Sequence, residues 1–216
     1  MNKNGAYFVA LVTEERYSPA HWDPFTYRSH EVGGTLSDYA CIERTAAKRI
    51  PYGLPRFRPI EYHDLPGGEC LSFTLERRTT VDKQSAVAVE AGALLFGTMR
   101  AYLGNVAVTP QAAWIGCEAP VFFETKSEFV SIKPDDGLTY FWMAYLRSRH
   151  FLQHLPLGSG GTRPRLNPLA LGVISVSVPD LPTRKSIHDR LYDLARREWA
   201  TRSETADAIQ YLFQSL

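Results

Sequence analysis

The sequence predicts an α/β protein of the α+β kind, in which a β-rich body with flanking helices is followed by one long C-terminal helix. From residue 33 onward, short apolar runs alternate with turn clusters that contain glycine and proline, which is typical of a β-rich body. The apolar period becomes helical over residues 138–155. Residues 183–216 contain neither proline nor glycine and carry apolar side chains at helical spacing.

The predicted elements divide the chain into three parts. Residues 1–32 form an entry arm packed on the domain, with one strand at 7–12. Residues 33–182 form the domain itself, and residues 183–216 form the long helix. Within the domain, the best strand candidates are the short apolar runs 93–96, 105–109 and 119–123, together with the β-branched run at 171–178. Residues 138–155 are predicted to be one helix.

The composition limits the class of protein. A chain of 216 residues, 44% of them hydrophobic, buries a sizeable core without disulfides. The net charge of +1 provides no global basic field, so any surface for nucleic acid must be local. The three cysteines include no CxxC pair and are typical of reduced thiols, and the first apolar run is too short to span a membrane. We therefore expect a soluble, cytoplasmic protein with no metal.

The C-terminal helix is longer than a small body needs. About 30 residues at 1.5 Å per residue span roughly 45 Å, and the polar middle at 201–205 would not bury fully. A partner helix on the apolar stripe and a helix folded back on its own domain are both compatible with this pattern. The residues expected to contact a partner are Ile187, Leu191, Leu194, Trp199, Ile209, Leu212 and Phe213.

The stretch GSGGTRPRLN, residues 158–167, looks like a phosphate-binding loop. It lacks the lysine followed by serine or threonine of a P-loop, and it follows a helix, whereas phosphate loops lead from a strand into a helix. We therefore predict a structural corner in which Gly158, Gly160 and Gly161 allow positive φ and close backbone approach. Its rim, with Arg163 and Arg165, is expected to face DNA.

Three groups of basic residues are the strongest indication of a binding surface. The first, at residues 44–58, contains no acid and has Tyr52 and Phe57 interleaved. The second lies at residues 77–84, and the third joins the turn-like segment 97–104 to the loop 158–167. Such side chains can neutralise phosphates or read base edges. The predicted DNA-binding residues are Arg44, Lys48, Arg49, Arg56, Arg58, Arg77, Arg78, Lys83, Gln84, Arg100, Asn105, Arg163 and Arg165.

Two patterns suggest metal chemistry. Glu124-Thr125-Lys126 follows an apolar run, and with Glu118 or Asp82 it would resemble the carboxylates and lysine of a metal-dependent endonuclease. His150 and His154 stand four residues apart, but no glutamate lies between them. A solvated strand end and packing histidines explain these residues more simply. A nuclease and a non-catalytic protein-interaction module therefore remain alternatives to DNA recognition.

The order of features resembles one protein family. AGALLFGTMRAYLGNVAV is followed by APVFFETKSEFVSIKPDDG, LTYFWMAYLRSRHFLQHL, GSGGTRPRLNPLALGVISVSVPDLP and a long polar helix. This order resembles the target recognition domain of type I restriction-modification specificity subunits, over residues 33–216. The chain is similar to a half-length form, with a single recognition domain and a single long helix.

The resemblance implies a non-catalytic subunit that recognises double-stranded DNA in a restriction-modification or related phage-defence system. It would direct a partner N6-adenine DNA methyltransferase, which holds the S-adenosylmethionine, so this chain would need no cofactor. The long helix would pair with a second copy or with a second recognition chain, and a symmetric pair implies an inverted-repeat target. The resemblance leaves open whether a restriction or translocase subunit also takes part.

Overall fold

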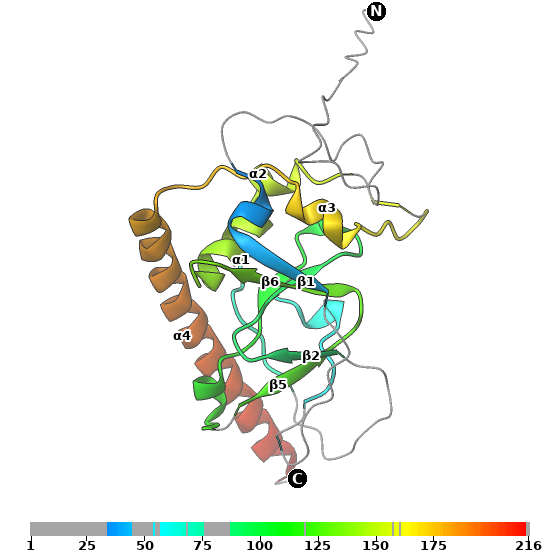
Figure 1. Cartoon of the computed structure of the whole chain (residues 1–216). Helices are drawn as coiled ribbons and strands as arrows, with labels where there is room; N and C mark the ends of the chain where they lie inside the picture. The colour runs from blue at the N-terminus through cyan, green and yellow to red at the C-terminus, as the bar shows by residue number, and fades with distance from the viewer. Residues whose placement is uncertain are drawn as a thin grey trace, which may run out of the picture.

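The computed structural model describes residues 34–44, 54, 57–67, 69–75, 87–118, 120–156, 158–159 and 161–214. Antiparallel sheets, short helices and one long C-terminal helix make up the fold (Figure 1), so the predicted α+β class is confirmed. The entry arm and its strand at 7–12 lie outside the described residues, and the division of the chain at residues 33 and 183 stays a prediction. No helix in the described residues is both long and apolar enough to span a bilayer.

The larger sheet has four antiparallel strands in the order β1-β6-β3-β4. Its strands are β1 (Ala40–Arg44), β6 (Phe129–Pro134), β3 (Leu94–Gly97) and β4 (Val106–Val108). Leu94 pairs with Ile132 on one side and with Val108 on the other, which fixes the register. The strands predicted at 93–96 and 105–109 are thus confirmed.

A smaller sheet pairs β2 (Val87–Glu90) with β5 (Phe122–Thr125). The strand predicted at 119–123 is therefore shifted toward the C-terminus, because β5 pairs with β2 as far as Thr125, which is buried like Phe123. Phe123 belongs to a second hydrophobic cluster. This cluster fills the space between the two sheets and includes Phe57, Ile60, Phe73, Val89, Leu95, Ala107, Val121, Phe123 and Phe129.

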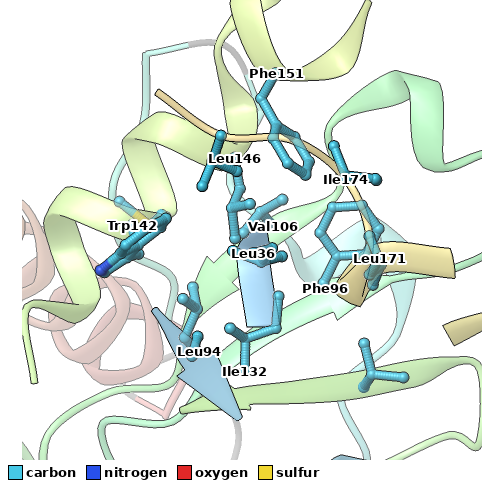
Figure 2. Packing of buried hydrophobic residues seen from close by; sticks show 14 of the residues in the cluster. Leu36, Leu94, Phe96, Val106, Ile132, Trp142, Leu146, Phe151, Leu171 and Ile174 are labelled. Atoms are coloured by element: carbon cyan, nitrogen blue, oxygen red, sulfur yellow. The ribbon is translucent and has the colours of Figure 1, made fainter. Parts of the chain in front are cut away.

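The main core lies between the larger sheet and α1 (Thr139–Arg147). Figure 2 shows Trp142 and Leu146 of α1 facing Leu94, Val106 and other residues of the sheet. Trp142 and Leu146 are both 0% exposed. Leu36, near the start of the described residues, and Leu171 and Ile174, shortly before the C-terminal helix, belong to the same core.

The helix predicted over residues 138–155 is broken at Ser148, which separates α1 from α2 (Arg149–Leu152). Ser148 has extended backbone, with φ −68° and ψ 147°. Its hydroxyl donates to Tyr145 O at 2.6 Å and accepts from Phe151 N at 3.2 Å. The serine therefore ends one helix and caps the next, and Phe151 turns into the core with 1% exposure.

The strand predicted at residues 171–178 is wrong. Residues Pro168–Gly172 form the short helix α3, because Asn167 caps it by accepting from Leu169 N at 3.2 Å and Pro168 occupies its first turn. In the segment that follows, Ile174 and Val176 are buried, but it forms only one isolated bridge in the described structure, Thr35 with Ser175.

The long helix α4 (Leu181–Gln214) confirms the predicted C-terminal helix and begins two residues earlier than expected. Pro182 fits in the first turn because the first N–H groups of a helix have no intrahelical acceptor. Figure 1 shows α4 running along one side of the molecule. It packs on α1 through the fully buried Ala195 and through His188, whose Nδ1 accepts from Tyr140 N at 3.2 Å.

Candidate nucleic-acid interface

The turn after β3 holds an unusual backbone conformation at Arg100. Its φ of 49° and ψ of 47° are left-handed, and it is the one non-glycine residue with positive φ in the described part of the chain. This conformation costs an L-residue roughly 1–2 kcal/mol. The turn continues into the 3-10 helix Ala101–Leu103, and it leaves Arg100 exposed together with Tyr102 and Leu103, each 58% exposed.

The loop 158–166 is joined to this turn by main-chain hydrogen bonds. Arg100 N donates to Pro164 O at 2.8 Å, and Leu166 N donates to Thr98 O at 2.9 Å. Within the loop, Ser159 and Arg165 exchange two hydrogen bonds of 3.0 and 2.8 Å. Two basic segments about 60 residues apart in sequence thus lie next to each other, and the Arg100 guanidinium also donates to Thr162 O at 3.3 Å. We call their three exposed arginines, Arg100, Arg163 and Arg165, the arginine face.

The glycines of this loop behave differently from the prediction. A Cβ at Gly158 would lie 3.0 Å from three backbone atoms of Arg165, so the expected close approach is confirmed there. The positive-φ glycines that the structure describes, Gly92, Gly104, Gly116 and Gly137, lie outside this loop. Gly160 lies outside the described residues.

Tyr62 contacts the main chain beside the arginine face, and the sequence analysis did not predict it. Its hydroxyl accepts from Met99 N at 3.0 Å and donates to Glu128 O at 3.3 Å, and its ring stacks on Phe129 at 4.7 Å. Burial raises the pKa of Tyr62 to about 12, because it removes the water that would stabilise the phenolate. Nothing in the local spacing distinguishes Tyr62 from the other tyrosines of the chain.

Glu128 is the second residue that the sequence analysis missed. It precedes β6, and its carboxylate forms an ion pair of 2.5 Å with Arg165 Nη2. The Arg165 side chain is nevertheless 62% exposed, whereas that of Glu128 is 22% exposed. The arginine face therefore contains one carboxylate as well as three guanidinium groups.

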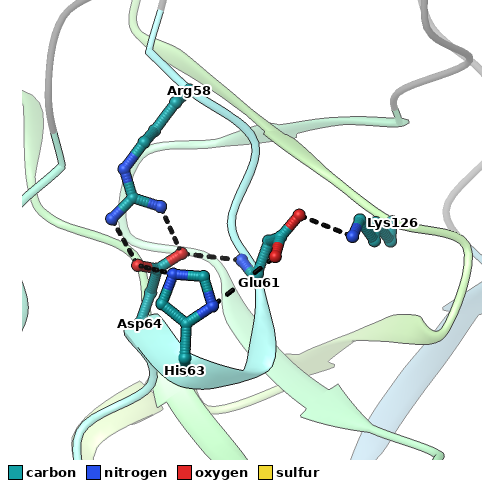
Figure 3. A network of polar contacts seen from close by, with 5 residues as sticks. All are labelled: Arg58, Glu61, His63, Asp64 and Lys126. Carbon is teal, nitrogen blue, oxygen red and sulfur yellow. Dashed lines mark hydrogen bonds and ion pairs between the residues drawn. The ribbon is translucent and has the colours of Figure 1, made fainter.

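The first basic group is only partly described. Figure 3 shows Arg58 forming a bidentate ion pair with Asp64, whose side chain is 3% exposed. Burial by itself would raise the pKa of Asp64, but the hydrogen bonds from Arg58 and from Glu61 N, with the Arg58 charge, hold it below its usual value. Arg58 thus fixes the segment around residues 58–64. Lys48, Arg49 and Arg56 lie outside the described residues, as does the side chain of Arg44.

The remaining predicted DNA-binding residues fall in two places. Asn105 is half-buried at the base of the Arg100 turn, where its main-chain carbonyl accepts a hydrogen bond from Gly97 N at 2.8 Å. Arg77, Arg78, Lys83 and Gln84, the whole second basic group, lie outside the described residues.

The residues of the possible metal-binding pattern, Glu124 and Lys126 with Glu118 or Asp82, are described in part. Lys126 forms an ion pair of 2.5 Å with Glu61 (Figure 3), and its hydrogen bond lowers the pKa of Glu61. Glu124 is half-buried, Glu118 is exposed, and Asp82 lies outside the described residues. Among the residues the structure describes, no three His, Cys, Asp or Glu side chains gather as metal ligands would.

His150 and His154 lie together at the end of α2. Their rings are 5.4 Å apart, and His154 Nδ1 lies 2.6 Å from His150 O.

The apolar stripe of α4 is divided between two environments. Leu191 and Trp199 pack half-buried on the domain, and the Trp199 ring lies 6.1 Å from that of Trp114. Four others are exposed to solvent, namely Ile187, Leu194, Ile209 and Leu212. The side chain of Phe213 is not among those described. The helix therefore folds back on its domain along one edge of the stripe and leaves the other edge uncovered.

Two solved structures show a partial similarity to this chain. One is a chain from a structural study of complex assembly and conformational transition of the type I R-M system, at 18% identity and a TM-score of 0.42, covering 84% of this chain and 42% of that one. Another is the HsdS subunit from Thermoanaerobacter tengcongensis, at 16% identity and a TM-score of 0.40, covering 79% of this chain and 38% of that one.

This chain thus spans less than half the length of either structural neighbour. No protein-family model matches its sequence, and no curated protein does. At these identities the likenesses assign no role to any residue.

Proposed function

We propose that this chain is a non-catalytic subunit that recognises a DNA sequence and directs a partner N6-adenine DNA methyltransferase to it. The observation that carries the proposal is the arginine face. Main-chain hydrogen bonds lock two distant segments together, and both present exposed arginines on the same surface. Backbone strain of the kind found at Arg100 clusters at functional sites and persists where the surroundings hold it.

The chemistry of the arginine face suits duplex DNA. Guanidinium groups neutralise phosphates and also form two-pronged hydrogen bonds to base edges. Tyr102 and Leu103 extend the same surface with exposed apolar groups that can contact sugars and thymine methyl groups. In Figure 1, α3 and the segment before it lie on the side of the domain opposite α4. DNA and a partner helix would therefore approach different sides.

The uncovered edge of α4 is proposed to contact partner proteins. These are a second copy of the chain or a second recognition chain, together with the methyltransferase, and a restriction or translocase subunit is compatible with the same arrangement. A symmetric pair would present two arginine faces and recognise an inverted repeat. The methyltransferase would hold S-adenosylmethionine, and this chain would act without a cofactor.

Methylation of a defined target is the direct test. We expect the full chain, expressed with an adenine methyltransferase from the same genome, to restrict adenine methylation of plasmid DNA to one sequence motif, read by modification-sensitive sequencing. The chain alone should neither methylate nor cleave that plasmid in the presence of Mg²⁺. Methylation that is equally unselective with and without the chain would exclude the proposal, and cleavage lost in Lys126→Ala would favour the nuclease.

Lysine substitutions on the uncovered edge of α4 should prevent assembly without unfolding the domain. Ile187, Leu194 and Leu212 lie 7 and 18 residues apart, close to whole numbers of helical turns, and all three are exposed. We expect their joint replacement by lysine to convert the assembled chain to monomers in sedimentation experiments. The melting temperature of the domain should change little, because surface substitutions rarely alter stability by more than about 0.5 kcal/mol.

A matched control is provided by exposed polar residues of the same helix. Arg190, Arg197 and Glu204 are exposed, and their joint replacement by alanine should leave the assembly state unchanged. An assembly state that is equally insensitive to the lysine variant would assign the interface to another surface.

A further inference from the structure

The three arginines of the arginine face have different electrostatic environments. Among the described residues, no carboxylate lies within ion-pair distance of Arg100 or Arg163, so each presents a full positive charge. Arg165 instead shares its charge with Glu128 across 2.5 Å. A phosphate contact derives its strength from uncompensated charge, so Arg165 is the least suited of the three to that task.

Arg165 is well suited to a contact that requires hydrogen bonds in fixed directions. Its guanidinium has five N–H donors, and the hydrogen bond from Nη2 to Glu128 uses one of them. Four donors remain on a side chain that is 62% exposed. Two parallel donors are what the O6 and N7 acceptors of guanine require in the major groove.

The main chain on both sides of this ion pair is fixed. Arg165 pairs through its backbone with Ser159 and is also bridged to Met99. The main-chain carbonyl of Glu128 accepts hydrogen bonds from Thr98 N at 2.9 Å, from Thr98 Oγ1 at 2.8 Å and from Tyr62 OH at 3.3 Å. The carboxylate is thus attached to a rigid backbone and holds one end of the Arg165 fork, which reduces the entropy lost when the other end binds.

From this geometry we infer that Arg165 reads a guanine in the DNA target, with Glu128 as its positioning residue, while Arg100 and Arg163 contact phosphates. This inference rests on the proposed function and adds a base identity to it. It departs from the expectation that both loop arginines would face DNA in the same way, because the Glu128 partner, 37 residues away in the chain, is visible only in the structure.

The test is selection from a pool of random-sequence duplex DNA by the full chain, followed by affinity measurements at several salt concentrations. The wild-type protein should select a motif that contains a guanine. Arg165→Lys keeps the charge but loses the fork. It should lower the preference for that one guanine on the order of tenfold or more and leave the salt slope unchanged.

The companion variants distinguish the roles. Arg163→Ala should weaken binding to all sequences alike and reduce the salt slope by about 0.9. Glu128→Gln should weaken the same guanine preference as Arg165→Lys, yet raise affinity for unrelated DNA, because it removes a negative charge from the face. A purely structural role for Glu128 would instead lower affinity for every sequence together with the melting temperature.

Failure of this inference and failure of the proposed function would give different results. A selected motif without guanine, or unchanged preferences in Arg165→Lys, would overturn the inference while the proposed function stands. A reduction of the slope by about 0.9 in Arg165→Ala with intact preferences would make Arg165 a phosphate contact. If the wild-type protein, alone and with its methyltransferase, selects no sequence, the proposed function fails and this inference fails with it.

Discussion

Asp136→Ala is expected to lower the free energy of unfolding by about 3–5 kcal/mol, because it breaks a largely buried ion pair by removing one partner. Asp136 accepts from Leu138 N at 3.0 Å and from Trp142 Nε1 at 3.1 Å, and it forms an ion pair with Arg184 of α4. The side chains of both ion-pair partners are 13% exposed. Urea denaturation followed by tryptophan fluorescence measures the loss.

The adjacent aspartate is the matched control. Asp135 is exposed, so Asp135→Ala should change the free energy of unfolding by no more than about 0.5 kcal/mol. Equal effects of the two substitutions would show that the contacts of Asp136 contribute little, and that apolar contacts together with His188 and Glu198 hold α4 on the domain.

Removing two charges from the arginine face should weaken DNA binding strongly. If Arg100 and Arg163 each contact one phosphate, the double alanine variant loses about 1.8 from the slope of log K against log salt. Extrapolated from 1 M to about 0.15 M salt, this corresponds to an affinity about 30-fold lower, equally for preferred and unrelated sequences. Fluorescence anisotropy with labelled duplexes over a salt series measures both quantities.

Two arginines elsewhere serve as the control for total charge. Arg196 and Arg197 are exposed on α4, away from the arginine face, and their joint replacement removes the same charge. The salt slope of that variant should match wild type. A slope reduced as much as in the Arg100 and Arg163 double variant would mean that net charge, and not this surface, determines DNA affinity.

The parts of the fold predicted correctly are those where one local signal dominates. The run that contains β3 is apolar and closed by Gly97, and α4 has an uninterrupted helical period. The errors arose where two signals competed. The β-branched run at 171–178 masked the start of α3, although Asn167 followed by Pro168 is a helix-start signal. Helical periodicity likewise hid the break at Ser148.

For the candidate site, the sequence indicated which residues are basic but not which residues they contact. Arg100, Arg163 and Arg165 were selected from the sequence as basic residues beside turns. That they share one surface depends on main-chain hydrogen bonds between distant segments, which leave no pattern in the side chains. The pairing of Arg58 with Asp64 was missed because the acid lies six residues beyond the basic run that was considered.

The loop 158–166 uses only its backbone atoms in the hydrogen bonds that join it to the Arg100 turn, including the one that Thr162 O accepts from the Arg100 guanidinium. They therefore tolerate replacement of the side chains at Thr162, Arg163 and Arg165, because any residue except proline supplies the same N–H and C=O groups. New side chains could be exchanged on this loop without refolding the scaffold beneath it. Such modularity would let a protein of this architecture acquire new sequence preferences by single substitutions, and it makes the loop a natural starting point for engineering altered specificity.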